Sequence, residues 1–366
     1  MRKGWEYKRW KEVLTIINGK NQSAVVDENG EYPIYGSGGI MGYANNWLCP
    51  ENCVIIGRKG NINKPIFVET KFWNVDTAFG LNANIEYLLP KFLFYFCLDY
   101  NFERHNKAVT IPSLTKADLL KIDIPLPPKS TQLAIVSELD KINELIRLKK
   151  EQLKDFDNLA QSLFYEMFGD PVENEKGWEV KKLGEVCTIE RGGSPRPINN
   201  YITESEDGIN WIKIGDAQEG SKYITSTKEK IKPEGVKKSR FVHKGDFILS
   251  NSMSFGRPYI LKVDGCIHDG WLVIHDNNNV FAKIYLYYLL ASSIMYENFS
   301  QLAVGGVVNN LNSSLVRKVE VSIPPLSLQR LFAQRIEQIE REKSEVQKSI
   351  QDLETLLASR MQYWFE

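Results

Sequence analysis

Residues 130–168 read STQLAIVSELDKINELIRLKKEQLKDFDNLAQSLFYEMF, and this stretch decides the fold. Mostly apolar positions recur along it at alternating spacings of four and three residues, an average of about 3.5. The positions of this first seam are Ile135, Leu139, Ile142, Ile146, Lys149, Leu153, Phe156, Ala160, Leu163 and Met167. The spacing predicts one long helix whose seam pairs with another helix, as in a coiled coil.

A second stretch with the same spacing occupies residues 327–366. Its seam positions are Phe332, Ile336, Ile339, Lys343, Val346, Ile350, Leu353, Leu357, Arg360 and Trp364. At ~1.5 Å per residue, each helix of roughly 38 residues would span about 57 Å. The residues predicted to pair the helices are Ile135, Leu139, Ile142, Ile146, Leu153, Phe156, Leu163, Phe332, Ile336, Ile339, Val346, Ile350, Leu353 and Leu357.

Both predicted helices begin directly after a Pro-Pro pair. Ser130 and Ser327 follow these pairs and are predicted N-caps, because a serine oxygen can accept a hydrogen bond from an early helical N–H. Gly169, followed shortly by Pro171, is predicted to end the first helix.

The chain also repeats itself. Gly4-Trp5-Glu6 corresponds to Gly177-Trp178-Glu179, an offset of 173. Residues 124–128 (IPLPP) with Gln132 correspond to residues 321–325 (VSIPP) with Gln329, an offset of 197. The second copy therefore carries 24 extra residues between these two anchors.

We predict an α+β protein with two pseudo-symmetric mixed α/β domains, separated by two long helices that form an antiparallel coiled coil. The predicted segments are residues 1–129 (the first copy), 130–169 (the first helix), 170–326 (the second copy) and 327–366 (the second helix). A pseudo-two-fold axis between the copies would make the helices antiparallel and bring Lys149 and Lys343 to the same level. The alternative use of such heptads is homodimerisation.

The composition is that of a soluble globular protein, with 43% apolar and 25% charged residues in 366. The sequence has no apolar run long enough to cross a membrane and no signal-peptide pattern at its N-terminus, so we expect a cytoplasmic protein. Its five scattered cysteines fit reduced core thiols better than a disulfide framework.

The chain resembles the specificity subunit of type I restriction-modification systems. The resemblance rests on the two globular copies, each followed by a long helix after a Pro-Pro pair, and on three motifs. These motifs are the Gly-Trp-Glu openings, residues 191–197 (RGGSPRP) and residues 245–250 (GDFILS). The first copy departs from the second motif, since residues 19–22 (GKNQ) stand in its place.

The resemblance implies a function in DNA recognition without catalysis. Each copy would be a target recognition domain that reads one half of a bipartite site in double-stranded DNA. The helices would set the gap and dock two methyltransferase subunits, and through them restriction and translocase subunits. S-adenosylmethionine and ATP would bind only to those partners. This chain itself would bind no cofactor and no metal, and it would not associate with a membrane.

The residues themselves give no sign of an enzyme. No Walker A motif is present, the four histidines lack metal-ligand spacing, and the Pro-Pro pairs lack the preceding Asn or Asp that an amino-methyltransferase needs. Lys+Arg and Asp+Glu both number 46, whereas a DNA-binding protein that acts alone usually has a basic excess. If this chain binds DNA, either its basic residues are locally concentrated or partner subunits supply much of the attraction to phosphates.

Candidate DNA-contacting residues lie on loops, because long polar side chains on loops can reach phosphates and base edges. The best loops, residues 57–65 and 250–259, follow β-like runs at corresponding places in the two copies, although an ordinary solvated turn would also have this composition. Trp73 and Trp211 are interpreted as core aromatics. The candidates are Arg58, Lys59, Asn61, Asn63, Lys64, Lys107, Thr110, Arg191, Arg196, Asn199, Asn251, Ser252, Ser254, Arg257, Tyr259, Asn309 and Asn310.

Three other functions fit parts of this pattern. One is the specificity subunit of a related restriction enzyme that carries methylation and cleavage on one polypeptide. The others are a homodimeric coiled-coil scaffold and a transcriptional repressor with two DNA-reading domains. A scaffold would protect no DNA sequence, and a repressor would bind its operator tightly without partners.

Overall fold

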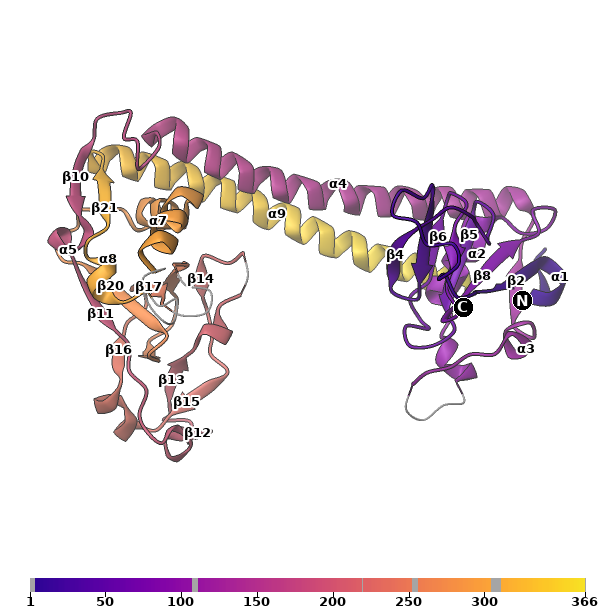
Figure 1. Ribbon diagram of the computed structural model, residues 1–366, viewed down its shortest axis with the longest axis horizontal. Coiled ribbons are helices and arrows are strands. Elements are labelled where there is room, and N and C mark those ends of the chain that lie inside the picture. The colour runs from indigo at the N-terminus through magenta and orange to yellow at the C-terminus, as the bar shows by residue number, and fades with distance from the viewer. Residues whose placement is uncertain (1–3, 107–110, 219, 252–255, 304–310, 366) are drawn as a thin grey trace. The chain divides into compact units, whose positions relative to one another are not determined.

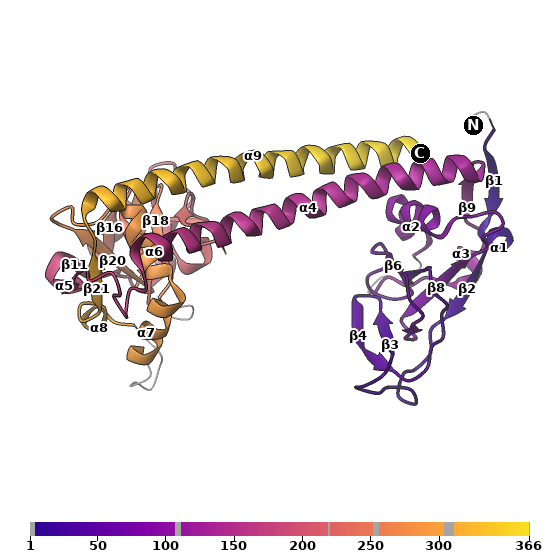
Figure 2. The same ribbon diagram turned by 90° about the horizontal axis from the view of Figure 1, so that it is seen from above.

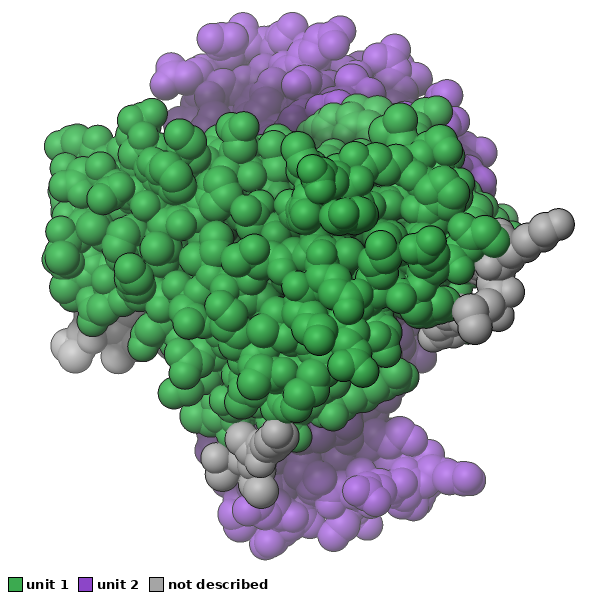
Figure 3. Space-filling view, turned by 90° about the vertical axis from the view of Figure 1, so that its right-hand side faces the viewer, with its two compact units in different colours: residues 1–151, 346–366 green, residues 152–345 purple. Residues whose placement is uncertain are grey.

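The computed structural model describes residues 4–106, 111–218, 220–251, 256–303 and 311–365. The chain divides into two compact units, coloured in Figure 3. Unit 1 contains residues 1–151 and 346–366, and unit 2 contains residues 152–345. Each unit therefore combines one globular copy with part of each long helix.

The two long helices are α4 (Lys129–Phe168) and α9 (Leu326–Phe365), each of 40 residues. The prediction of serine N-caps is wrong, because both helices begin before the serine. The carbonyl of Pro128 accepts from the N–H groups of Thr131 and Gln132, and Pro325 does the same at the start of α9. Gly169 ends α4 as predicted, with a φ of 75° that favours glycine.

In each unit the two helices lie side by side and antiparallel (Figures 1 and 2). In unit 1, Glu138 of α4 pairs with Arg360 of α9, and Lys150 pairs with Glu354 at 2.7 Å, so residue numbers rise on one helix as they fall on the other. In unit 2, Asp157 pairs with Lys343 at 2.5 Å, and the Phe168 ring lies 5.3 Å from the Phe332 ring.

The predicted seam is the buried face of both helices. Ile135, Leu139, Phe332 and Ile336 are at most 1% exposed, and none of the seam residues is classed as exposed. The phase changes at the end of α4, where Phe164 and Phe168 are 1% and 2% exposed while Leu163 and Met167 are half-buried. Phe164 and Phe168 are buried in place of Leu163 and Met167 because they also pack on Tyr285 of the second copy.

The prediction that Lys149 and Lys343 lie at the same level of the paired helices is also wrong. Lys343 contacts Asp157, which lies eight residues beyond Lys149 on the same helix, or about 12 Å along its axis. Lys343 does turn outward to carboxylates, since Glu340 also lies 4.0 Å away.

The first copy is built on a four-stranded antiparallel sheet whose strand order is β2, β8, β5, β6. Helix α2 (Pro90–Asp99) packs on it, and β1 (Glu6–Arg9) pairs with β9 (Asp123–Leu126) beside the start of α4 (Figure 2). A separate three-stranded sheet has the order β4, β3, β7. The remaining bounds are α1 (Trp10–Val13), β2 (Leu14–Asn18), β3 (Tyr32–Gly36), β4 (Gly39–Ala44), β5 (Cys53–Gly57), β6 (Ile66–Val68), β7 (Trp73–Asn74), β8 (Ala78–Ala83) and α3 (Lys116–Leu119).

The second copy repeats this plan with additions. Its main sheet has the order β11, β20, β17, β18, β14, and a second five-stranded sheet has the order β12, β15, β13, β19, β16. The bounds are β10 (Glu179–Lys182), α5 (Leu183–Val186), β11 (Cys187–Arg191), β12 (Ile202–Thr203), β13 (Ile209–Ile212), β14 (Tyr223–Ile224), β15 (Glu229–Ile231), β16 (Arg240–Val242), β17 (Phe247–Ser250), β18 (Pro258–Leu261), β19 (Gly265–Ile267), β20 (Trp271–Asp276), α6 (Lys283–Ala291), α7 (Ser293–Ala303), α8 (Ser313–Val316) and β21 (Glu320–Ile323).

The strand register shows where the extra residues are. Leu81 pairs with both Ile16 and Val54, and Ile274 pairs with both Ile189 and Phe247. The offset between copies is thus 173 at β2 and β11 but 193 at β5 and β17. Twenty of the 24 extra residues therefore lie between β11 and β17, where the second copy builds strands β12 to β16.

The glutamines that follow the Pro-Pro pairs have the same structural role in both copies. Gln132 is fully buried, accepts from the Leu89 N–H at 2.8 Å and donates to the carbonyls of Tyr87 and Pro127. Gln329 is also fully buried and makes the equivalent three contacts with Ala282, Val280 and Pro324. One side chain thus fastens the start of each long helix to the start of α2 or α6.

Candidate nucleic-acid interface

In the first copy the predicted loop, residues 57–65, turns sharply after β5. A side chain at Gly57 would come within 2.4 Å of the Asn61 carbonyl oxygen, and Gly60 has a φ of 78°, so this turn needs both glycines. The Gly60 N–H donates to the Pro112 carbonyl, and Lys59 forms a β-bridge with Ser113. The fold therefore brings residues 57–60 and 111–113 side by side.

The candidate side chains of this loop differ in what they contact. Lys59, Asn61 and Lys64 are exposed. Asn63 accepts from the Phe102 N–H at 2.8 Å and donates to Asn101 at 3.3 Å, so its amide holds the following turn in place. Arg58 is exposed, lies over the Phe79 ring at 5.8 Å and donates to the Asp76 carbonyl at 3.5 Å.

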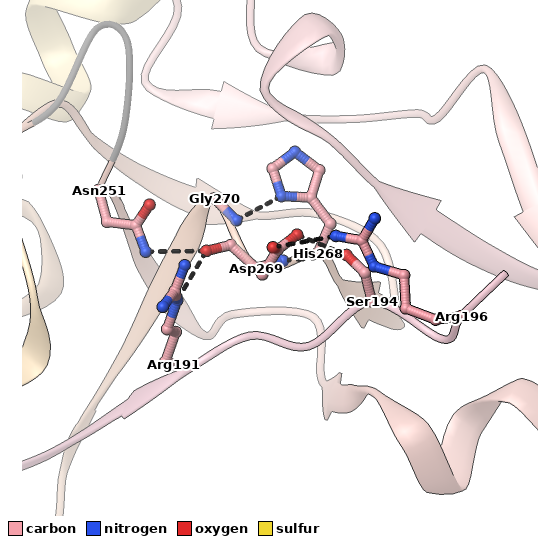
Figure 4. A network of polar contacts seen from close by, with 7 residues as sticks. All are labelled: Arg191, Ser194, Arg196, Asn251, His268, Asp269 and Gly270. Carbon is pink, nitrogen blue, oxygen red and sulfur yellow. Dashed lines mark hydrogen bonds and ion pairs between the residues drawn. The ribbon is translucent and has the colours of Figure 1, made fainter. Parts of the chain in front are cut away.

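In the second copy three loops meet at Asp269 (Figure 4). Its backbone carbonyl accepts from Arg191 Nε at 3.0 Å and from Asn251 Nδ2 at 2.9 Å. Its carboxylate accepts from the Ser194 hydroxyl at 2.5 Å and lies 3.5 Å from the guanidinium of Arg196. The hydrogen bond from Ser194, aided by the charge of Arg196, lowers the pKa of Asp269.

Glycines make this convergence possible. A side chain at Gly192 would come within 2.1 Å of the His268 carbonyl oxygen, and one at Gly270 would collide with the His268 ring. His268 Nδ1 accepts from the Gly270 N–H at 2.6 Å, and burial lowers the pKa of the imidazole. The ring is therefore uncharged at neutral pH and serves to hold the loop.

The remaining candidates of the second copy fall into three groups. Arg191, Arg196, Asn199 and Arg257 are exposed. Asn251 is 1% exposed, and Tyr259 is 7% exposed with its ring against Trp271, so these two side chains lie inside the protein. Ser252, Ser254, Asn309 and Asn310 lie outside the described residues, as do Lys107 and Thr110 of the first copy.

Two aromatic interpretations are confirmed, and one central residue was missed. Trp73 and Trp211 are 8% and 2% exposed and belong to the core. Asp269 was not among the candidates, because its partners Ser194 and Arg196 lie more than 70 residues away in the sequence. Asp269 is the counterpart of Asp76 at the offset of 193, which the strand pairing reveals and the sequence anchors do not.

Both copies match the same protein family. The family described as the type I restriction modification DNA specificity domain matches residues 2–155 and 175–355, which are most of the chain. The chain belongs to this family. The specificity-subunit chain is also 26% identical over 349 residues to the S.HindORF215P protein of Haemophilus influenzae, which carries the name of a type I restriction enzyme specificity subunit. The match covers 92% of this chain and 87% of that protein.

Other relatives agree with this assignment. The specificity subunit of the type I restriction enzyme MjaVIII of Methanocaldococcus jannaschii is 24% identical, with 96% of this chain and 92% of the relative covered. A chain from a structure of type I system assembly and conformational transition has a TM-score of 0.67 at 20% identity, covering 99% of this chain and 97% of that one. The crystallised S subunit from M. genitalium has a TM-score of 0.58 at 15% identity, with 99% and 96% covered. These structures support the two-domain fold.

In the described part of the chain, no helix is long and apolar enough to cross a membrane. Within the same residues, no group of three His, Cys, Asp or Glu side chains is placed to hold a metal ion. All five cysteines are buried and unpaired.

Proposed function

We propose that this specificity subunit reads a bipartite sequence in double-stranded DNA, one half-site for each copy. The observation that carries the proposal is the duplicated site: the strands β5 and β17 end at equivalent places, and each is followed by a loop with exposed basic side chains, Lys59 and Lys64 in the first copy and Arg257 in the second. Such side chains are suited to phosphates and to base edges. Family membership extends over both copies and supports the same assignment.

We further propose that the long helices set the gap between the half-sites and dock two methyltransferase subunits, which in turn recruit restriction and translocase subunits. The chain itself would do no chemistry, and S-adenosylmethionine and ATP would bind to the partners. The neutral net charge supports dependence on partners, because DNA affinity depends strongly on the number of phosphates neutralised.

An exchange of one copy tests the assignment of half-sites. Residues 1–129 are replaced by the equivalent segment of a relative, and the methylated motif is determined by sequencing DNA modified by the assembled complex. One half-site should change while the other half-site and the gap stay the same. Simultaneous change of both half-sites would contradict separate recognition by the two copies.

Partner dependence is tested by DNA-binding assays on the purified chain. Alone it should bind cognate and scrambled duplexes weakly and with little discrimination. Addition of methyltransferase subunits should raise the affinity for the cognate duplex by orders of magnitude, because they add phosphate contacts and surround the DNA. Tight, sequence-specific binding by the isolated chain would favour a repressor instead.

A further inference from the structure

The residue that follows β5 in the first copy and β17 in the second is held by the same backbone contacts. In the first copy, the Arg58 N–H donates to the Thr77 carbonyl, and the Arg58 carbonyl accepts from the Leu114 N–H. In the second copy, Asn251 makes the same two contacts with Gly270 and Leu311. Arg58 and Asn251 are therefore structural counterparts.

The side chains of these counterparts also reach equivalent atoms. Arg58 donates to the carbonyl of Asp76, and Asn251 donates to the carbonyl of Asp269. The two aspartates are thus counterparts as well, and their backbone carbonyls have the same structural use. Any special role of Asp269 must therefore come from its carboxylate.

The Asp269 carboxylate contacts a loop whose sequence motif is absent from the first copy. It binds Ser194 and Arg196, which belong to residues 191–197 (RGGSPRP). The Arg196 side chain nevertheless remains 73% exposed, and a guanidinium has five N–H donors, so most of them stay available to DNA. The carboxylate thus contacts the guanidinium through one nitrogen, Nη2.

We propose that Asp269 is a positioning residue for the second half-site, which orients Arg196 and its loop toward the bases. The proposal rests on the proposed function, because it assumes that the second copy reads DNA. The fixed negative charge has a second effect: it opposes the approach of phosphates to Arg196 and so reduces sequence-independent binding. Asp269 therefore improves discrimination in two ways, by orienting the cation and by disfavouring its non-specific use.

The test uses the complex with methyltransferase subunits and duplexes that carry the methylated motif, or that motif with one half-site scrambled. Asp269→Asn keeps the backbone carbonyl and the shape of the side chain but removes the charge. Discrimination at the second half-site should fall roughly tenfold, in the range of one well-placed base contact. The slope of log affinity against log salt should steepen by about one phosphate contact for scrambled DNA, because Arg196 is released.

Two matched variants separate positioning from structural damage. Asp76→Asn, at the counterpart position, should leave discrimination at the first half-site unchanged, since Asn keeps the carbonyl that Arg58 uses. Arg196→Gln should lose the same discrimination as Asp269→Asn, and the double variant should lose no more than either alone. This non-additivity is specific to an aspartate that acts through Arg196.

The outcomes distinguish the two proposals. Unchanged discrimination and an unchanged salt slope in Asp269→Asn, with a wild-type complex that reads both half-sites, would overturn the positioning role alone. An equal loss at both half-sites together with a lower melting temperature would also overturn it, in favour of a purely structural role. A wild-type complex that discriminates at neither half-site would overturn the proposed function and this inference with it.

Discussion

The two copies share a scaffold and differ at the ends of its strands. Four strands of the main sheet have the same order and the same antiparallel pairing in both copies, and the same buried glutamine occurs in both. Beyond the end of the central strand, the first copy presents an exposed Arg58, whereas the second turns Asn251 inward and gathers an arginine-bearing loop around Asp269. The two copies therefore keep the contacts that build the main sheet and differ in the contacts of the loops that follow β5 and β17.

The buried glutamines give the largest expected effect, because each serves three backbone groups that would otherwise be left without partners. Gln132→Leu and Gln329→Leu should each destabilise the protein by about 2–4 kcal/mol, the cost of burying such groups unsatisfied. Unfolding by urea measures the loss, and amide hydrogen exchange at Leu89 and Ala282 locates it in unit 1 or unit 2.

This pair of variants tests whether the two glutamines have the same role in the two copies. If the equivalence of the copies is real, the two losses should agree to within about 1 kcal/mol, and each should be confined to its own unit. A neutral effect in one copy would mean that water or a neighbouring group replaces the glutamine there. Gln→Met variants at the same positions serve as controls for size, since methionine keeps the length of the side chain without its amide group.

Much of this scaffold could be predicted from the sequence. The seams follow from the 3.5-residue spacing, which is a local property of the chain, and the duplication follows from its anchors. The phase change at Phe164 and Phe168 could not be predicted, because it depends on Tyr285, more than 100 residues away. The N-caps failed for a similar reason, since Gln132 and the Pro128 carbonyl organise the helix start before Ser130.

The attachment of each globular copy to its own helix gives the second-largest effect. Equivalent tyrosines take part in both: Tyr95 donates to Asp140 at 2.6 Å, whereas Tyr288 lies 3.4 Å from the ammonium of Lys222. Lys222 is 9% exposed and pairs with Glu340 at 2.7 Å, and its burial lowers its pKa. The first copy is thus attached to its helix through the half-exposed carboxylate of Asp140, and the second through the buried ammonium of Lys222.

Glu340→Gln should therefore cost more than Asp140→Asn. The first variant leaves a buried ammonium without its carboxylate, and we expect about 2 kcal/mol, less than for a fully buried pair because Glu340 is 37% exposed. The second breaks the contact with Lys91, in which both side chains are more than a third exposed, and we expect about 1 kcal/mol. Equal losses in urea unfolding would show that burial of Lys222 does not matter.

The candidate site could be predicted only in outline. The two loops were found because their composition and their place after a strand are visible in the sequence. The separate uses of their residues were not visible: Asn63 holds the Phe102 backbone, and Asn251 is covered by segments from elsewhere in the second copy. Burial and long-range partners decide these uses, and neither is a property of the local sequence.

The smallest expected effect concerns the contacts between the helices. Glu138 accepts from Arg360 Nη2 and from Trp364 Nε1, both at 3.0 Å, and is 34% exposed, whereas Asp157, the partner of Lys343, is 67% exposed. Glu138→Gln should cost about 1 kcal/mol at pH 7, and Asp157→Asn less than about 0.5 kcal/mol, because exposed pairs are screened by solvent.

The pH dependence separates the charge of Glu138 from its packing. The hydrogen bond from Arg360 lowers the pKa of Glu138, so the folded protein holds this proton less tightly than the unfolded chain. Its contribution is then fully present above the unfolded pKa of about 4.3 and is lost as the pH falls through the lower folded value. Urea unfolding at pH 7 and at successive values below pH 5 should show the difference between wild type and Glu138→Gln shrinking toward zero. A difference that stays constant over this range would assign the effect of Glu138 to packing against Trp364 instead of to its charge.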